Sequence, residues 1–301
     1  MRIIAITTTS LAEFDRQPLE LLKANNCEAI LNPYKRKLKG EEVIELCRDA
    51  VGIIAGTESL DAKVIEQLNT IKVISRCGSG MDNVDSAAAK KKGIKVFNTP
   101  DAPTLAVAEL TLGLTLGILR KINQMDAAIR SGKWDKLMGN LLCGKKVGII
   151  GFGRTGKKVA DLLRPLDCQI AYADPFIEEG ASGFRRLSKE DLLKWAQIIT
   201  IHVSTNEKII GRNEFNLMNK GSWIINVSRG HILDEDALYE YLKNGYIAGA
   251  ALDVFQDEPY NGPLKELDNV ILTPHIGSYA KEARIRMEIE AVKNLLAGLE
   301  R

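Results

Sequence analysis

Short runs of β-branched and aliphatic residues alternate with amphipathic stretches along most of the chain. Such a run predicts a buried strand, and a stretch with apolar residues every three or four positions predicts a helix. The strands expected in the first hundred residues are Ile3–Ile6, Glu28–Leu31, Gly52–Ala55, Lys72–Ser75 and Lys95–Phe97. The amphipathic stretches between them are Leu19–Asn25, Glu41–Asp49 and Ala62–Leu68. This alternation predicts a parallel sheet covered by helices.

A second series of strand-like runs follows, again with helical segments between them. Its members are Lys146–Ile150, Gln169–Ala173, Gln197–Ile201, Trp223–Asn226, Ile247–Asp253 and Val270–Thr273. A chain of 301 residues is long enough for about two domains. The two series therefore predict an α/β protein with two doubly wound parallel-sheet domains.

The connection between the two series has the features of a hinge. Two prolines fall within Asn98–Pro103, and the fixed backbone angle of proline makes such a segment stiff. One long apolar helix is expected next, from Thr104 to about Arg130. The final segment, Lys281–Leu299, has helical periodicity and no strand after it, so we expect it to pack on the first domain. The expected domains are 1–98 with 280–301, and 99–279.

Composition and charge narrow the class of protein. Hydrophobic residues make up 45% of the chain, charged residues 27%, and the net charge is +2, as in an ordinary soluble globular protein. No basic stripe indicates a nucleic-acid partner. The longest apolar stretch, Thr104–Leu119, contains Glu109 and falls short of the ~20 residues that cross a bilayer. We therefore expect neither nucleic-acid nor membrane binding.

The cysteines indicate a reducing environment. They are scattered without CxxC or CxxH spacing, so free thiols in a cytoplasmic protein, with no metal site, are the expected state. Met1–Ile6 is too short for a secretory signal. A nucleophilic role for Cys77 stays open as an alternative. The five cysteines are Cys27, Cys47, Cys77, Cys143 and Cys168.

A glycine-rich hexapeptide, 151–156, stands between the strand-like run Val147–Ile150 and the helix-like run Lys157–Leu163. In that context the first glycine permits a tight turn and the second lets a pyrophosphate approach the backbone. The third lets the helix pack close to the strand, so that phosphates meet its N-terminus. The expected cofactor-binding residues here are Gly151, Gly153, Arg154, Thr155 and Gly156.

Asp174 follows the next strand, Gln169–Ala173. An acidic side chain at that position accepts hydrogen bonds from the adenosine ribose, and its charge repels a 2′-phosphate. No arginine or lysine stands immediately beside it. The expected cofactor is therefore NAD rather than NADP. The alternative is that Asp174 only caps the next turn.

Three ionisable residues, Arg229, Glu258 and His275, fall in loops after expected strands of the second series. Active sites of α/β proteins collect in such loops. Hydride transfer between a nicotinamide and a 2-oxo acid needs a cation for the carboxylate and a proton donor at the carbonyl oxygen. Arginine and histidine have those chemistries, and a glutamate would fix the tautomer of the histidine. Taken singly, the three could also be a surface arginine, a turn carboxylate and a capping histidine.

The motifs around these residues resemble the D-isomer-specific 2-hydroxyacid dehydrogenases, and within them the D-3-phosphoglycerate dehydrogenase branch. The resemblance spans nearly the whole chain. It includes Ser75–Asp85, which is similar to the substrate loop of the family, and Ala106–Leu110, which is similar to the start of its interdomain helix. The remaining motifs are the glycine fingerprint at 151–156, and Ile225–Gly230, Leu252–Pro259 and Leu272–Ser278.

The resemblance implies roles for the catalytic loops. Arg229 would bind substrate, His275 would exchange the proton, and Glu258 would tune His275. Asp253 would lie by the nicotinamide carboxamide. Further cofactor contacts are expected at Val227 and Ser228.

The resemblance also implies an architecture, in which a flavodoxin-like substrate domain and a Rossmann NAD domain enclose a cleft. The backbone N–H groups of Ser79 and Gly80 would hold the substrate carboxylate, with Arg76 nearby. The helix from Thr104 and the segment Gly132–Trp134 would form a homodimer interface.

Two departures bear on the ligands. Ala55–Glu58 stands where the phosphoglycerate branch commonly has an arginine, and Arg76 or Lys35–Lys37 could compensate. His202–Lys208 is shorter than the usual loop near the adenine. His202 and His231 match no catalytic position, and we interpret both as structural or surface residues.

The expected reaction is the NAD-dependent interconversion of a D-2-hydroxy acid and its 2-oxo acid. The expected pair is 3-phosphoglycerate and 3-phosphohydroxypyruvate, with glyoxylate, hydroxypyruvate or another small 2-oxo acid as the alternative. The alternative from another class is a non-catalytic interaction protein that senses NAD(H).

Overall fold

The computed structural model of the chain describes residues 1–178 and 183–300. It divides into two compact units, which are here called unit 1 and unit 2. Unit 1 consists of Met1–Pro103 and Ser278–Arg301, and unit 2 of Thr104–Gly277. Arg301, the last residue of the first expected domain, lies outside the described residues.

Unit 1 contains a five-stranded parallel sheet with the order β2-β1-β3-β4-β5. This order is flavodoxin-like, in agreement with the domain type that the family resemblance implies. Its strands are β1 (Arg2–Ile6), β2 (Cys27–Leu31), β3 (Gly52–Ala55), β4 (Val73–Arg76) and β5 (Lys95–Asn98). Its helices are α1 (Gln17–Ala24), α2 (Gly40–Leu46), α3 (Ala62–Gln67), α4 (Ser86–Lys91) and α11 (Lys281–Glu300).

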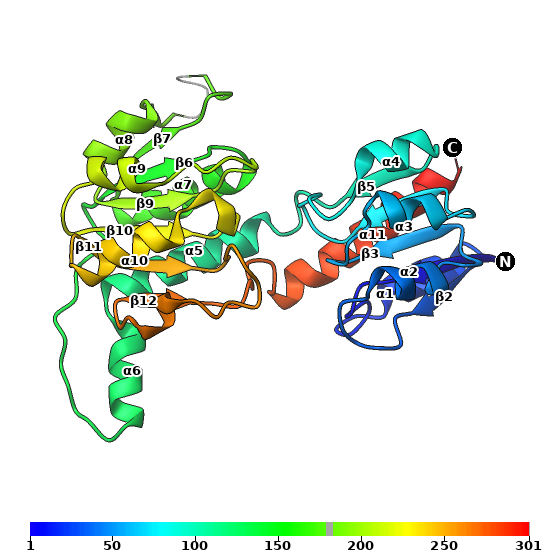
Figure 1. Cartoon of the computed structure of the whole chain (residues 1–301), viewed down its shortest axis with the longest axis horizontal. Coiled ribbons are helices and arrows are strands. Elements are labelled where there is room, and N and C mark those ends of the chain that lie inside the picture. Colours follow the sequence, from blue (N-terminus) through cyan, green and yellow to red (C-terminus); the bar gives the residue numbers. More distant parts are fainter. Residues whose placement is uncertain (179–182, 301) are drawn as a thin grey trace. The chain divides into compact units, whose positions relative to one another are not determined.

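Helices cover both faces of this sheet. Figure 1 shows α11, in red, beside the blue and cyan strands of unit 1, and α11 and α1 pack on the same face. That face is closed by Ile4, Val73, Met287 and Leu295, all at most 1% exposed. The helices α2, α3 and α4 cover the other face. The last helix of the chain thus completes a core that the first hundred residues begin.

Unit 2 contains a seven-stranded parallel sheet with the order β12-β11-β10-β9-β6-β7-β8. Its strands are β6 (Lys146–Ile150), β7 (Gln169–Ala173), β8 (Arg185–Arg186), β9 (Ile198–Ile201), β10 (Ser222–Asn226), β11 (Ile247–Leu252) and β12 (Val270–Leu272). The order contains the Rossmann arrangement, which the sequence predicts. The short edge strand β8 is not predicted, because two arginines carry no apolar pattern.

The helices of unit 2 also lie on both faces. They are α5 (Thr104–Leu119), α6 (Ile122–Arg130), α7 (Arg154–Leu163), α8 (Lys189–Trp195), α9 (Arg212–Leu217) and α10 (Glu235–Lys243), with the short 3-10 helices η1 (Arg164–Leu166), η2 (Gly230–Ile232) and η3 (Pro263–Glu266). The helices α5 and α7 pack against one face, and α8, α9 and α10 against the other. Both faces are buried, which explains why the inner strands of the sheet are mostly apolar.

The prediction of a single helix from Thr104 to about Arg130 is wrong, because the structure has two helices there. Lys121 adopts a left-handed conformation with φ of +52°, which cannot continue an α-helix. The carbonyl oxygen of Leu119 instead accepts a bond from Asn140 N–H at 2.9 Å. A later loop therefore ends α5, and α6 starts in a new direction.

Two buried threonines of α5 form hydrogen bonds inside the helix. The hydroxyls of Thr111 and Thr115 donate to the carbonyls of Val107 and Thr111, each at 2.7 Å. Among the described residues, no helix combines the length and the apolar character needed to span a membrane.

Candidate active site

The candidate residues of unit 2 follow the carboxyl ends of its strands. All strand pairs in this sheet are parallel, so these ends meet at one edge. In open α/β sheets, ligands bind outside this edge where the strand order reverses, which here is between β6 and β9. The loops at the edge carry, in chain order, Gly151, Asp174, His202, Arg229, Asp253 and His275.

The glycine loop has the form that a phosphate group needs. Gly151 has φ of +89°, a conformation that residues with a Cβ rarely adopt. A Cβ on Gly156 would lie 2.1 Å from the carbonyl oxygen of Gly151, so only glycine lets α7 approach β6 this closely. A Cβ on Gly153 would meet no heavy atom within 4 Å, so the loop surface there is open. The N–H groups at the start of α7 follow directly, from Arg154 on.

Both carboxylate oxygens of Asp174 accept bonds from backbone N–H groups. Oδ2 accepts from Phe152 at 2.7 Å, and Oδ1 accepts from Phe176 at 2.8 Å. The alternative in which Asp174 caps the next turn is therefore observed, and the same side chain also holds the glycine loop. Each oxygen retains a second lone pair, so Asp174 can still accept a hydrogen bond from a ligand.

His275 and Glu258 form a pair. Nδ1 of the imidazole lies 2.9 Å from Oε2 and 3.2 Å from Oε1 of the carboxylate. Oε1 also accepts a bond from Phe255 N–H at 3.1 Å, which fixes the carboxylate. The His275 side chain is 50% exposed, and its Nε2 has no partner in the described part of the chain. The pairing keeps a proton on Nδ1 and leaves Nε2 accessible for proton exchange.

Asp253 holds the loop that carries His275. Oδ1 accepts from the Thr273 hydroxyl at 2.6 Å and from Ile276 N–H at 2.8 Å, and Oδ2 accepts from Gly277 N–H at 2.8 Å. The residue is 0% exposed, and this burial raises the pKa of its carboxyl group above the ordinary value. Its buried carboxylate thus shapes the turn on both sides of His275.

Arg229 stands in a loop that Asn226 shapes. The Asn226 amide donates to the carbonyl oxygen of Arg229 at 2.9 Å, and its Oδ1 accepts from Ser228 N–H at 3.1 Å. A Cβ on Gly230 would lie 1.8 Å from the carbonyl carbon of Phe255, so the loops after β10 and β11 are in close contact. Sequence reasoning missed Asn226, although an asparagine that ends a buried apolar strand is a usable signal.

The expected substrate residues of unit 1 follow β4. Arg76 ends that strand, and its Nη1 donates to the carbonyl oxygen of Cys77 at 3.2 Å. Ser79 is exposed and Gly80 is partly buried. Their backbone N–H groups have no partner among the residues that the structure describes. These two donors are therefore available to an anion.

Glu58 occupies the loop after β3, where the phosphoglycerate branch would have a cation. The residue is 1% exposed, and its two oxygens accept from Gly56 N–H at 2.9 and 3.1 Å and from the Thr7 hydroxyl. The Asn83 amide donates to the carbonyl oxygens of Gly56 and Glu58 at 3.2 and 2.6 Å. The Glu58 side chain therefore stabilises this loop through hydrogen bonds. It places a carboxylate, and no cation, at this position.

Cys77 and His231 lack the features of catalytic groups. Burial raises the pKa of the Cys77 thiol to about 11, which keeps it protonated and unreactive at neutral pH. The ring of His231 lies 2.8 Å from the carbonyl oxygen of Thr205 through Nε2, which is a structural contact.

His202 follows β9 and packs against the glycine loop. Its N–H donates to the carbonyl oxygen of Ile150 at 2.7 Å, and its Nε2 lies 2.8 Å from the Thr200 hydroxyl oxygen. Nδ1 is closed to solvent, although the residue as a whole is only partly buried. Burial lowers the pKa of His202 from 6.5 to about 3, so the imidazole is neutral.

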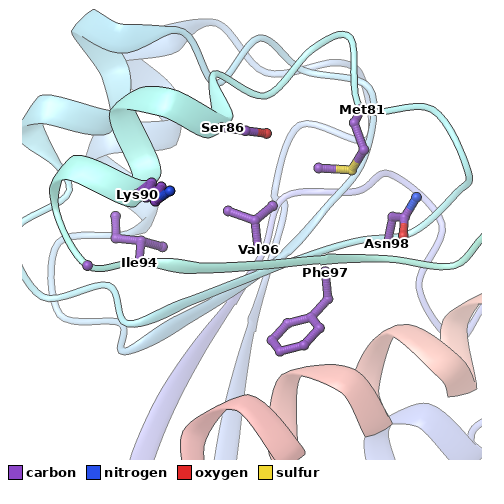
Figure 2. A pocket seen from close by; sticks show the side chains of 8 residues that line it. Met81, Ser86, Lys90, Ile94, Val96, Phe97 and Asn98 are labelled. Carbon is purple, nitrogen blue, oxygen red and sulfur yellow. The ribbon is translucent and has the colours of Figure 1, made fainter.

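A cavity of about 480 Å³ lies in unit 1 between α4 and β5 (Figure 2). Met81, Ser86, Lys90 and Val96 line it, and none of the expected site residues does. Asn98 also lines it, and the Asn98 amide donates to the carbonyl oxygen of Ser79 at 2.8 Å. The cavity therefore lies beside the expected substrate loop, Ser75–Asp85, which contributes Met81 to its lining.

Gly156→Ala is expected to destabilise unit 2 strongly, because its Cβ would overlap a backbone oxygen that cannot move without breaking the glycine loop. Gly153→Ala is the matched control, since its Cβ enters open space. Urea unfolding of both variants checks this, with a loss of about 2 kcal/mol or more for Gly156→Ala and much less for the control. Equal losses would contradict the packing argument.

His202→Gln is expected to flatten the pH dependence of stability on the acid side. The folded state resists protonating His202 until about pH 3, whereas the unfolded chain takes up the proton near pH 6.5. The wild type therefore loses stability as pH falls through that window, and the variant loses less. Melting temperatures at pH 7 and pH 4.5 measure the difference. A variant with the same drop as the wild type would show that His202 does not cause it.

Known proteins are similar to this chain in sequence and in fold. Residues 112–277 match the sequence family described as D-isomer specific 2-hydroxyacid dehydrogenase, NAD binding domain. The D-3-phosphoglycerate dehydrogenase of Methanocaldococcus jannaschii is 42% identical over 275 residues, which are 87% of this chain and 52% of that protein. The glyoxylate reductase of Thermofilum pendens is 39% identical over 276 residues, which are 86% of this chain and 81% of that protein.

A solved glyoxylate reductase from Paecilomyes thermophila superposes with a TM-score of 0.89 at 29% identity, covering 100% of this chain and 96% of that one. The chain spans about half the length of the first two curated relatives, 52% and 56%. The predicted fold class, the predicted family and the predicted NAD-binding domain are confirmed. The chain belongs to the D-isomer specific 2-hydroxyacid dehydrogenase family.

Proposed function

We propose that the protein catalyses the NAD-dependent interconversion of a D-2-hydroxy acid and its 2-oxo acid. The observation that carries this proposal is the His275–Glu258 pair, in which Nδ1 is engaged at 2.9 Å and Nε2 is available. The pair sits on a loop that a buried carboxylate fixes, at the same sheet edge as Arg229 and the glycine loop.

In the reducing direction, protonated His275 donates a proton from Nε2 to the carbonyl oxygen of the 2-oxo acid as that oxygen becomes an alkoxide. Glu258 stabilises the protonated imidazole and fixes its orientation. The Arg229 guanidinium binds the substrate and stabilises the developing negative charge. NADH, when bound, supplies the hydride that completes the reduction. The reverse reaction returns the proton to Nε2.

The cofactor residues are proposed from the same edge of the sheet. The N-terminus of α7 offers N–H groups and a positive dipole end to the pyrophosphate. Asp174 would accept bonds from the adenosine ribose, and Asp253 would lie by the nicotinamide carboxamide. The remaining proposed cofactor contacts are Gly151, Gly153, Arg154, Thr155, Gly156, Val227 and Ser228.

We propose 1–98 with 280–301 as the substrate domain and 99–279 as the NAD domain. In the substrate domain, the N–H groups of Ser79 and Gly80 bind the substrate carboxylate, and Arg76 adds positive charge. The open N–H groups of these two residues support the assignment.

The proposed substrate pair is 3-phosphoglycerate and 3-phosphohydroxypyruvate. Two relatives named D-3-phosphoglycerate dehydrogenase, at 42% and 35% identity, support it, as do the exposed Lys35 and Lys37. The buried carboxylate of Glu58 favours a second candidate, an unphosphorylated acid such as glyoxylate or hydroxypyruvate. Relatives named for reduction of those acids support the second candidate as well.

A homodimer is also part of the proposal. Figure 1 shows α6 and the green loop after it extending from the rest of unit 2. Their exposed apolar side chains support burial against a second copy, since such a patch is rare on a free surface. These side chains are Ile122, Ile129, Trp134, Leu137, Met138 and Leu141.

Incubation of the purified protein with NADH and a panel of 2-oxo acids tests the activity and the substrate together. We expect oxidation of NADH with 3-phosphohydroxypyruvate, at a higher kcat/KM than with hydroxypyruvate or glyoxylate. A reversed ranking would favour the second candidate. An inactive protein that binds NADH, and binds a partner protein only in its presence, would favour an NAD(H) sensor instead.

His275→Ala is expected to lower kcat by about 10²- to 10⁴-fold, because it removes the proton donor, while NADH affinity stays close to the wild-type value. His231→Gln is the matched control, since it keeps a polar side chain beside the Thr205 carbonyl. Steady-state kinetics and NADH fluorescence titration provide the two measurements. Unchanged kcat in His275→Ala would remove His275 from the mechanism.

A further inference from the structure

The expected substrate loop of unit 1 contains Gly78, a glycine whose conformation other contacts must hold in place. Gly78 has φ of +143°, a backbone conformation that L side chains rarely adopt. A Cβ there would lie 1.3 Å from Nη1 of Arg76, because the guanidinium lies over this residue. Glycine is also the residue with the greatest conformational freedom. The loop Gly78–Gly80 therefore needs an external constraint to present its N–H groups in one orientation.

Thr99 supplies such a constraint from the segment after β5. The Thr99 hydroxyl accepts a bond from Gly78 N–H at 2.7 Å, and Thr99 N–H donates to the carbonyl oxygen of Gly78 at 3.0 Å. Both polar groups of the Gly78 backbone are thus bound by one residue. Thr99 is 0% exposed, so water cannot replace either bond.

Asn98, which precedes Thr99, extends the constraint from Gly78 to Ser79. Its side-chain amide donates to the backbone carbonyl oxygen of Ser79 at 2.8 Å, and its backbone carbonyl oxygen accepts from the Asn294 side-chain amide at 3.0 Å. Asn294 belongs to α11, so this contact fixes the segment at its other side. The bonds occupy the carbonyl side of Ser79 and leave the N–H groups of Ser79 and Gly80 without partners in the described residues.

The geometry points to Thr99 as a positioning residue for substrate binding, with Asn98 in a supporting role. Thr99 fixes the conformation of Gly78 and thereby directs the N–H groups of Ser79 and Gly80 toward the carboxylate of the 2-oxo acid. This role rests on the proposed function. Thr99 itself does not touch the substrate, so its effect is on affinity for the carboxylate and not on the chemical step.

The test compares Thr99→Val, which removes the hydroxyl acceptor at nearly constant shape, with Thr99→Ser, which keeps it. We expect Thr99→Val to raise KM for the best 2-oxo acid about tenfold, because it leaves a buried N–H group without a partner. kcat and the dissociation constant of NADH stay within about twofold, as when uniform binding is lost. Thr99→Ser is expected to remain close to the wild type, and Asn98→Ala is expected to raise KM less than Thr99→Val does.

Thr111→Val is the matched control. Thr111 is also buried, at 1% exposure, but its hydroxyl bonds only within α5. Calorimetric titration of the NADH-bound protein with oxalate measures carboxylate binding without turnover, and we expect the oxalate affinity to fall in parallel with the rise in KM. The Asn98→Ala arm decides the question if Thr99→Val does not fold.

Two outcomes would overturn the inference. One is an oxalate affinity in Thr99→Val equal to that of the wild type, and the other is an equal loss in Thr111→Val. Absence of turnover by the wild type on every 2-oxo acid would instead contradict the proposed function. Oxalate titration would still decide whether Thr99 positions an anion-binding loop.

Discussion

The three hydrogen bonds to the Asp253 carboxylate set the conformation of the loop that carries His275. A buried carboxylate stays in place only where donors compensate its lost hydration, and here all three donors come from the loop after β12. The loop after β11 also supplies Glu258, which binds Nδ1 of the His275 imidazole. The loop after β11 therefore fixes both the backbone and the ring of His275, which lies in the loop after the neighbouring strand β12. That arrangement depends in turn on the parallel pairing of β11 with β12.

Each unit has a glycine loop whose shape is held by a side chain from a neighbouring loop. In unit 2, Asp174 binds Phe152 N–H within the glycine loop. In unit 1, Thr99 binds Gly78. Gly151–Gly153 and Gly78–Gly80 lie outside the helices and strands, so no ladder of backbone bonds defines them. The same physical solution thus appears twice, once for a loop of the phosphate-binding type and once for the loop that we propose to bind a carboxylate.

Much of this could be predicted from sequence, because parallel strands and glycine turns leave strong local signals. The apolar runs located the long strands, and the spacing of glycines around Gly151 located the nucleotide loop. The break at Lys121 left no such signal, since lysine rarely adopts a positive φ and only the contact with Asn140 explains it. The role of Glu58 was missed for a related reason, because the fold brings its partner Thr7 to it from another loop. Asn226 differs, since it binds Ser228 and Arg229 within its own loop.

The return of α11 to unit 1 has a consequence for the order in which the chain folds. Met287 and Leu295, on that helix, are almost fully buried in the core that β1 and β4 begin. Unit 2 is one continuous segment, whereas unit 1 lacks one covering helix until the last residues of α11 have left the ribosome. Domains generally fold as units during synthesis. The second unit can therefore finish before the first, and the N-terminal sheet exposes an apolar face throughout that interval.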